Sequence, residues 1–457
     1  RAVASPIPED APVTITTGVL ASGWFMGDFR VLPAMGWHAT ARKPRTMAVP
    51  PPHRPRVVRW LNRLGPLVAP GWPSLDPDAI IEAASKKAKS DELGPTDFRD
   101  RLTRIIDTVN EEANLHWIGR LAVRQSLEGI LQSRFEVYRH RAEHPEIAGV
   151  PIEKPVFIVG LARSGTTILF NLLAQDPANR APYSWEVQYP NPPAEGDSFH
   201  RDARIQKAEK YFGQMEQMAP ELPAIHEIGA TLPQECMPFM AHTLLTPQPW
   251  WVYNIPGYQA WVDRQSAAPS YSYHRQFLEH LQSRHKKQRW ALKSPIHLAT
   301  LDALLGEYPD ARIIFTHRDP AKIVPSVASL FYTIGGIATD ALSPEKAGRD
   351  HLEWWAKAMN HAMEVRKANP DKAKQFVDIQ FEEVVEDPVA ALQRAYEKLG
   401  LEWTEEAETR MRAFLASNPR GKHGTHTYSL EDFGLRLGEI RERFGAYCEA
   451  YEVPLVL

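Results

Sequence analysis

A short segment near residue 160 has the residue types and spacing to hold an anionic group. It reads Gly160-Leu-Ala-Arg-Ser-Gly-Thr-Thr167 and lies between an apolar run, 156–160, and an apolar helical pattern, 168–174. A strand, a glycine-bearing turn and a helix N-terminus place backbone N–H groups around an anion. The segment nearly matches the ATP/GTP loop G-x-x-x-x-G-K-[ST], but Thr166 stands at the lysine position. Arg163 therefore supplies the cation, which favours a terminal phosphate or phosphosulfate over a magnesium triphosphate.

Arg318 and Ser326 form a second candidate anion site. The apolar segment 312–317 has the pattern of a buried strand, Arg318 follows it directly, and Asp319-Pro320 is typical of a helix start. An arginine at the carboxyl edge of a strand offers two parallel donors to a phosphate. Ser326, on the early turns of the next helix, adds a hydroxyl.

These two segments together resemble the family of sulfotransferases that use 3′-phosphoadenosine 5′-phosphosulfate (PAPS), in particular the broad bacterial branch whose loop carries Arg-Ser-Gly-Thr-Thr. The resemblance spans about residues 155–435, and the first 75 or so residues match only loosely. It implies that the loop holds the 5′-phosphosulfate, that Arg318 and Ser326 hold the 3′-phosphate, and that the basic loop 420–424 closes over that phosphate. Phe381 would lie near the adenine, where tyrosine is common. The implied donor-binding residues are Arg163, Ser164, Gly165, Thr166, Thr167, Arg318, Ser326, Phe381, Arg420, Gly421, Lys422, His423 and Gly424.

Two cations are expected to act on the reacting group. Sulfuryl transfer needs positioned reactants and stabilisation of the charge that develops on the bridging oxygen. Arg163 is placed for the leaving phosphate. Lys293 ends a short apolar strand, and the resemblance implies a role for it on the leaving or transferring oxygen.

A general base must also take the proton of the acceptor, and two residues compete for this role. Glu186 follows the phosphate-loop helix, where several branches of the family place a catalytic glutamate. His297 follows Lys293 by four residues, whereas cytosolic relatives place a catalytic histidine two residues after such a lysine. His226 and Glu235 are further alternatives.

The elements that must position these residues indicate an α/β fold. The predicted strands are Val156–Gly160, Trp290–Lys293, Arg312–His317 and Phe376–Phe381, with helices that begin near Thr166, Ala299, Ala321 and Val389. We expect a three-layer parallel sheet of P-loop nucleotide-kinase type within a sulfotransferase domain, 151–457.

Three further regions are expected around this sheet. The proline-rich segment 1–75 is predicted to be extended, and 76–150 to form helices. Residues 192–288 are predicted to form a helical insertion on the acceptor side. The aromatic run 250–261 within it either lines the acceptor pocket or packs in the core.

Composition excludes several other classes of protein. The net charge of −3 gives no global attraction to nucleic acid or to an anionic membrane, so anion sites must be local. Two cysteines, Cys236 and Cys448, exclude a disulfide scaffold and a cysteine zinc site and fit a reducing, cytoplasmic compartment. No apolar stretch approaches the roughly 20 residues of a membrane span.

We therefore expect a metal-free, cytoplasmic sulfotransferase that uses PAPS and releases 3′-phosphoadenosine 5′-phosphate (PAP). It would transfer the sulfuryl group directly, in line, to a hydroxyl or amine of a small-molecule or glycan acceptor. We also expect a homodimer, because much helical surface precedes the catalytic unit. The alternatives are a P-loop kinase of a small molecule and a non-catalytic nucleotide-binding scaffold.

Overall fold

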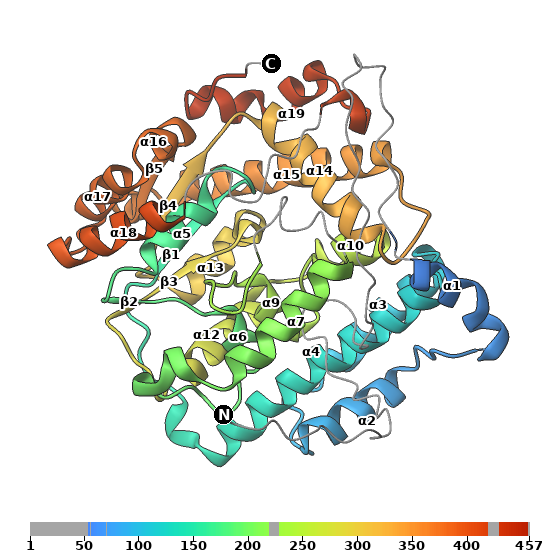
Figure 1. Cartoon of the computed structure of the whole chain (residues 1–457). Helices are drawn as coiled ribbons and strands as arrows, with labels where there is room; N and C mark the ends of the chain where they lie inside the picture. Colours follow the sequence, from blue (N-terminus) through green and yellow to red (C-terminus); the bar gives the residue numbers. More distant parts are fainter. Residues whose placement is uncertain (1–53, 55, 70, 219–227, 419–428, 456–457) are drawn as a thin grey trace, which may run out of the picture.

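A five-stranded parallel sheet forms the centre of the molecule, with strand order β2-β3-β1-β4-β5 (Figure 1). The computed structural model describes residues 54, 56–69, 71–218, 228–418 and 429–455. The strands are β1 Val156–Gly160, β2 Asn179–Arg180, β3 Arg289–Lys293, β4 Arg312–His317 and β5 Phe376–Gln380. In the register of the sheet, Val156 pairs with Ala291 on one side and with Arg312 on the other.

The central strand β1 is buried along its whole length because helices cover both faces of the sheet. Val156 and Ile158 share one hydrophobic cluster with α5 (Thr166–Leu173) and α17 (Pro388–Leu399). Phe157 and Val159, one residue out of phase, belong to the larger cluster on the opposite face. The three-layer α/β fold expected from the sequence is confirmed.

All four predicted strands are present, and their limits agree with the prediction to within one residue. The prediction missed β2, a two-residue edge strand that pairs with β3. Two residues carry no readable alternation, so no pattern in the sequence indicates it. The four predicted helices are α5, α13 (Leu301–Glu307), α14 (Pro320–Gly335) and α17, and α13 is preceded by a 3₁₀ turn, Pro295–Thr300.

The segment before the sheet is helical. Its helices are α1 Arg56–Val68, α2 Pro77–Ala88, α3 Phe98–Glu112 and α4 Trp117–Glu143. The last three lie in the region predicted to be helical, but α1 contradicts the prediction that the chain is extended up to residue 75. The prediction failed because the large apolar residues of α1 point to solvent, so they do not form the core-facing stripe expected of a buried helix.

The remaining helices complete the layers around the sheet. They are α6 Ser184–Gln188, α7 Arg204–Met218, α9 Met237–Met240, α10 Gln248–Tyr253, α11 Pro256–Val262, α12 Ala268–Gln282, α15 Pro344–Ala368, α16 Phe381–Glu386, α18 Glu405–Ser417 and α19 Leu437–Ala450. The described part of the insertion 192–288 is therefore largely helical.

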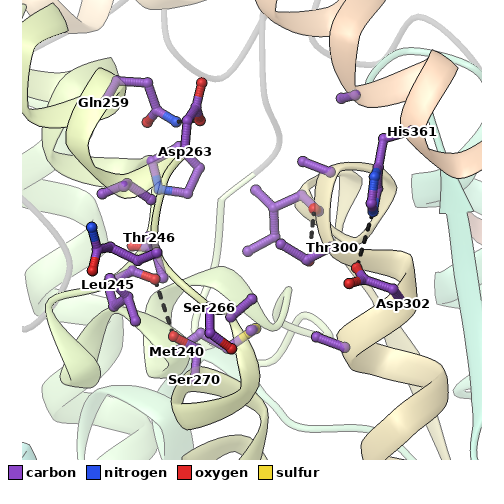
Figure 2. A pocket seen from close by; sticks show the side chains of 18 of the residues that line it. Met240, Leu245, Thr246, Gln259, Asp263, Ser266, Ser270, Thr300, Asp302 and His361 are labelled. Carbon is purple, nitrogen blue, oxygen red and sulfur yellow. Dashed lines mark hydrogen bonds and ion pairs between the residues drawn. The ribbon is translucent and has the colours of Figure 1, made fainter.

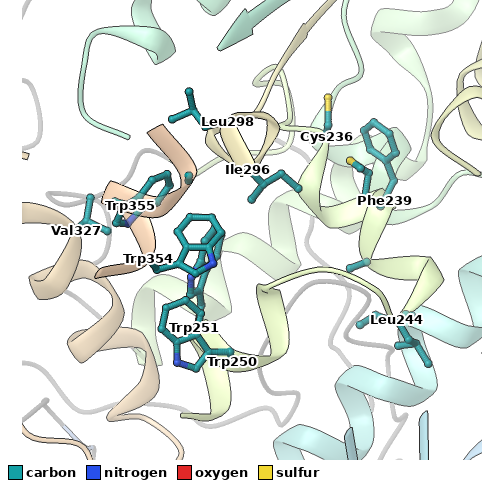
Figure 3. Packing of buried hydrophobic residues seen from close by; sticks show 14 of the residues in the cluster. Cys236, Phe239, Leu244, Trp250, Trp251, Ile296, Leu298, Val327, Trp354 and Trp355 are labelled. Carbon is teal, nitrogen blue, oxygen red and sulfur yellow. The ribbon is translucent and has the colours of Figure 1, made fainter. Parts of the chain in front are cut away.

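A cluster of tryptophans joins the insertion to α15 (Figure 3). Trp250 and Trp251 come from α10, and Trp354 and Trp355 come from α15. The rings of Trp354 and Trp355 lie 4.6 Å apart edge to face, and those of Trp251 and Trp355 lie 5.9 Å apart and nearly parallel. All four side chains are buried, so this part of the aromatic run packs in the core.

Several buried histidines, among them His242, His280, His297 and His351, are held in the neutral form. Burial lowers the pKa of His242, His280, His297 and His351 to about 3 in each case. In the unfolded chain the same side chains titrate near pH 6.5. Above that pH they are neutral in both states, and below it only the unfolded chain takes up these protons.

Acidification should therefore destabilise the fold before carboxylates are protonated. We expect the free energy of unfolding to fall between pH 7 and pH 5, by up to about 1.4 kcal/mol per pH unit for each such histidine. Urea midpoints at pH 5, 6 and 7 measure this slope, and His351→Gln should reduce it. Equal midpoints at pH 7 and pH 5 would contradict the assignment of these histidines as neutral.

Candidate functional site

The loop between β1 and α5 is closed tightly by contacts that only small residues allow. A Cβ on Gly160 would lie 2.1 Å from the Thr316 hydroxyl oxygen, so no larger residue fits where β1 leaves the sheet. The buried Ser164 hydroxyl lies 2.6 Å from the same Thr316 oxygen and also donates to the carbonyl of Leu161. Gly165 precedes α5 with a φ of 88°, a left-handed conformation that glycine adopts without strain.

Arg163 is also left-handed, with a φ of 70°. This conformation costs a residue with a side chain about 1 kcal/mol. The Arg318 guanidinium donates a hydrogen bond of 2.5 Å to the Arg163 carbonyl, which holds the strained loop in place. The two arginines predicted to bind the two ends of an anionic donor are thus in direct contact.

Arg318 and Phe381 meet at the carboxyl edge of the sheet. The guanidinium carbon of Arg318 lies 3.8 Å from the centre of the Phe381 ring. Phe381 is the first residue of α16, directly after β5. The Arg318 backbone N–H donates to the Tyr447 hydroxyl at 3.3 Å. An aromatic ring stacked on a guanidinium fixes the orientation of the guanidinium plane, while the N–H groups at its edge can donate to other groups.

Lys293 and Glu235 form an ion pair at the same edge. Lys293 ends β3 and is 3% exposed, and its ammonium group donates to the Glu235 carboxylate, which is 17% exposed. The N–H of Cys236 donates to the Lys293 carbonyl at 3.0 Å, so the chain before α9 is fastened to the end of β3. From the sequence, Glu235 was only a further alternative for the general base. Nothing in the residues around it indicates that the chain returns to the end of β3 at this point.

One cavity of about 450 Å³ joins all of these groups. Its polar end is lined by Arg163, Gly165, Thr166, Thr167, Arg318, Phe381, Lys293 and Glu235. Apart from Gln234 and Gln248, its other walls are apolar, and they come from α7, the segment around α9, and α10, α14 and α15. The apolar lining includes Phe212, Met215, Ile228, Met237, Pro238, Trp251, Val252, Leu330, Phe331, Ile334, Ile337 and Trp355.

The apolar wall was only partly foreseen. The aromatic run 250–261 contributes Trp251, which both packs in the core and lines the cavity. Phe331 and Ile334 of α14 were not singled out in the sequence. The sequence did contain an indication that α14 lines the cavity. This helix starts next to Arg318, so it leaves the same edge of the sheet and can turn an apolar side to the cavity.

Glu186 lies outside this cavity and is 1% exposed. Both of its carboxylate oxygens accept from the Arg180 guanidinium, at 2.8 and 2.6 Å, and one also accepts from the Tyr183 N–H at 2.8 Å. The position of Glu186 therefore does not support its predicted role as general base. Glu186 lies near the start of α6, after the helix that follows the loop, as the sequence predicted. Its side chain, however, points to the buried Arg180 of β2, an edge strand that the sequence did not predict.

His297 is likewise a core residue. It is fully buried, its Nδ1 lies 2.6 Å from the Tyr271 hydroxyl, and its ring packs edge to face on Phe157. Burial lowers its pKa to about 3, which makes it a weak base. It does not line the cavity, so its position gives no support to the second candidate base either.

The other predicted residues lie elsewhere. Ser326 is buried on α14 and is not among the residues that line the cavity. Ser164 is buried within the loop. Residues 420–424 and His226 lie outside the described residues.

A second cavity, of about 400 Å³, lies between α11, α12, α13 and α15 (Figure 2). Asp263 pairs with Lys357 at 2.9 Å, and Asp302 lies 3.0 Å from His361. None of the residues predicted from the sequence to act in catalysis or donor binding lines this cavity. Lys357 and His361, the basic side chains in this lining, are already paired with carboxylates, so the first cavity is the candidate active site.

Neither a metal-binding cluster at the first cavity nor a membrane-spanning helix is present among the described residues. One group of three side chains there could hold a metal ion, His140, Glu143 and His144 near the end of α4, and none of them lines the first cavity. Among the described helices, none is long and apolar enough to cross a membrane.

Comparisons with known proteins identify the family of this chain. The model of the sulfotransferase family matches residues 155–405, which include the phosphate loop, Lys293, Arg318 and Phe381. The ω-hydroxy-β-dihydromenaquinone-9 sulfotransferase Stf3 of Mycobacterium bovis is 25% identical over 312 residues, which cover 64% of this chain and 75% of the relative.

Two solved structures are similar over most of the chain. The sulfotransferase STF1 of Mycobacterium tuberculosis has 29% identity and a TM-score of 0.73, with 81% of this chain and 98% of that chain covered. STF9 of Mycobacterium avium has 26% identity and a TM-score of 0.76, with 83% and 97% covered. The family implies PAPS as the donor, which the anion-binding end of the cavity suits. With more than half of its length matched, this chain belongs to the sulfotransferase family and is a sulfotransferase.

Proposed function

We propose that this enzyme transfers the sulfuryl group of PAPS to a hydroxyl, or an amine, of a largely apolar small molecule. The observation that carries this proposal is the single cavity that joins the phosphate loop to an apolar chamber, with Lys293 and Glu235 at the junction. A donor held at one end and an acceptor held at the other would meet beside this ion pair.

The donor site in this proposal uses the residues expected from the sequence. The loop with Arg163, Thr166 and Thr167 would hold the phosphosulfate, and Arg318 would bind the 3′-phosphate beside Phe381 and the adenine. Ser326 and the loop 420–424 remain predicted partners of the 3′-phosphate. No metal ion has a part in the proposed reaction, because the charge on the leaving group falls to Arg163 and Lys293.

We propose Glu235 as the general base. Its carboxylate lines the cavity, whereas the carboxylate of Glu186 and the imidazole of His297 do not. The acceptor oxygen would attack sulfur as the bond from sulfur to the bridging phosphate oxygen breaks in line. PAP leaves with that electron pair, and the acceptor proton passes to Glu235. Lys293 would turn to the bridging oxygen as negative charge develops there.

The acceptor is proposed to be an apolar alcohol rather than a glycan. The chamber beyond Lys293 is built from aliphatic and aromatic side chains, which bind hydrocarbon and offer few partners to the many hydroxyls of a sugar. The relative from M. bovis is named for a menaquinone derivative with a terminal hydroxyl, which has this character. A cytoplasmic location and a homodimer stay predictions; the two cysteines of the chain are free and buried, as suits a reducing compartment.

The donor site predicts binding of PAP that depends on Arg318. Calorimetric titration should give tight PAP binding, and Arg318→Ala should weaken it by about 10-fold to 100-fold, because a charge-assisted bond to phosphate is worth roughly 1.5 to 3 kcal/mol. Arg264→Ala, at an exposed position away from the cavity, is the matched control. ATP with Mg²⁺ in place of PAP separates this enzyme from a kinase, and preferential binding of ATP would overturn the proposal.

The base assignment predicts opposite behaviour of two glutamates. Glu235→Gln should lower kcat/KM by about 100-fold or more while PAP binding persists, since general base catalysis contributes roughly 10² to 10⁴. Glu235→Asp should retain part of the activity and shift its pH dependence. Retention of full activity in Glu235→Gln would exclude it as the base.

Glu186→Gln is the contrasting variant. Removal of one partner of a buried ion pair leaves an uncompensated charge on Arg180, which destabilises by about 3 to 5 kcal/mol. Thermal unfolding should show this loss, and the folded fraction should turn over near the wild-type rate. Intact stability with lost turnover would restore Glu186 as the base.

The chamber predicts a preference for longer apolar alcohols. In a series of primary alcohols, kcat/KM should rise with chain length, by about 0.8 kcal/mol of binding per buried methylene, until the chamber is filled. Ile334→Trp should lower the length at which this rise stops and leave PAP binding unchanged. A rate that is independent of chain length would exclude an apolar acceptor.

A further inference from the structure

Most of the large apolar side chains that are exposed in the described residues lie close together in the sequence. Six large hydrophobic residues are exposed in the described part of the chain, and five of them lie between residues 60 and 72. They are Trp60, Leu64, Leu67, Val68 and Trp72, of which Leu67 and Val68 are 77% and 82% exposed. Scattered single apolar residues need no explanation, but a group of five within one short segment marks an interaction site.

The geometry of α1 gathers four of these residues into one stripe. Trp60, Leu64 and Val68 follow each other at four-residue spacing, and Leu67 lies beside them. The opposite side of the helix is fixed to α4. A Cβ on Gly65 would overlap the Trp117 ring, and the Asn62 side chain accepts from the Ile118 N–H at 2.9 Å. The apolar stripe therefore faces away from the protein.

Arginines flank this stripe. Arg56, Arg59 and Arg63 of α1 are exposed, and none of them is ion-paired within the described ranges. The segment of sequence around α1 is also positively charged. From Phe29 to Leu75 there is no Asp or Glu, although the segment contains Arg30, Arg42, Lys43, Arg45, Arg54, Arg56, Arg59 and Arg63. This positive charge is local, since the whole chain carries −3.

We propose that the docking face, defined as Trp60, Leu64, Leu67 and Val68 with the three flanking arginines, binds the surface of an anionic lipid bilayer. A helix with an apolar stripe bordered by arginines lies in the interface of a bilayer, with apolar side chains among the acyl chains and cations at the headgroups. Tryptophan, present here as Trp60, is enriched at that depth. A protein partner would have to present acidic groups around an apolar groove, whereas an anionic bilayer offers both everywhere.

The chain just before α1 is held beside the apolar end of the cavity. The Arg54 guanidinium donates to the carbonyls of Gly336, at 3.1 and 2.5 Å, and Thr339, at 3.0 Å. These residues adjoin Ile334 and Ile337, which line the cavity. Figure 1 shows α1 at the edge of the molecule that lies away from the sheet. An acceptor drawn from the bilayer would enter on this side, a statement that rests on the proposed function; the docking itself does not.

Vesicle flotation of the full chain tests the docking. We expect the protein to float with vesicles of phosphatidylcholine and phosphatidylglycerol, and much less with phosphatidylcholine alone. Trp60→Ser/Leu64→Gln/Leu67→Gln should reduce the partition coefficient at least about 10-fold. Arg56→Gln/Arg59→Gln/Arg63→Gln should reduce it by about 100-fold on anionic vesicles and remove the preference for them. Val385→Gln, at the sixth exposed apolar position, should leave binding unchanged.

The controls separate this proposal from its rivals. PAP binding by each variant shows that it is folded. Absence of flotation with anionic vesicles, or undiminished flotation of the apolar triple variant, would overturn the proposal. So would a dimer in sedimentation velocity that the triple variant abolishes without any vesicle binding, since the face would then join two copies of this chain. Loss of the proposed transferase activity would leave the flotation result unaffected, so the two proposals fail independently.

Discussion

The hydrogen bond from the Arg318 guanidinium to the Arg163 carbonyl ties together the two halves of the proposed donor site. It is possible because β1 and β4 are neighbours and their register sets Gly160 opposite Thr316. The loop and Arg318 leave the sheet from adjacent points, and the Thr316 side chain spans the gap between them. The sheet itself therefore sets the distance between the two anion-binding regions, and the strained backbone of Arg163 persists because neighbouring strands hold it.

A second constraint acts where the polar and apolar parts of the cavity meet. Lys293 is almost completely buried, and a lone ammonium group at such a position would be costly to desolvate. Glu235 offsets that cost in the absence of a donor. An anionic donor at the loop would compete for the same ammonium group. If Glu235 is the base, donor binding would release its carboxylate, so the order of binding would follow from the charges that this end of the cavity contains.

The sequence predicted the strands and the loop well, because each depends on neighbours in the chain. Val156–Gly160 is a continuous apolar run, and the turn after it carries its glycines at fixed positions. The surroundings of the candidate bases were harder to predict, because Glu186 and Glu235 differ in their neighbours in space and not in their local sequence. The edge strand that carries Arg180 is two residues long, and Glu235 reaches Lys293 across 58 residues of chain. Helix α1 was missed for a related reason: the rule that apolar residues face the core does not hold for a helix whose apolar stripe faces outward.

The apolar chamber alone cannot extract an acceptor from a membrane. Burial of hydrocarbon is favourable relative to water, but a bilayer interior is about as apolar as the chamber, so moving a hydrocarbon chain between them gains little. Capture of a membrane-borne alcohol would then depend on the groups proposed to meet its hydroxyl, Lys293 and Glu235, and on the proximity of the enzyme to the bilayer. The docking face would supply that proximity. It would raise the local concentration of acceptor without any tighter contact in the chamber. The chamber would then select among acceptors by their length and shape.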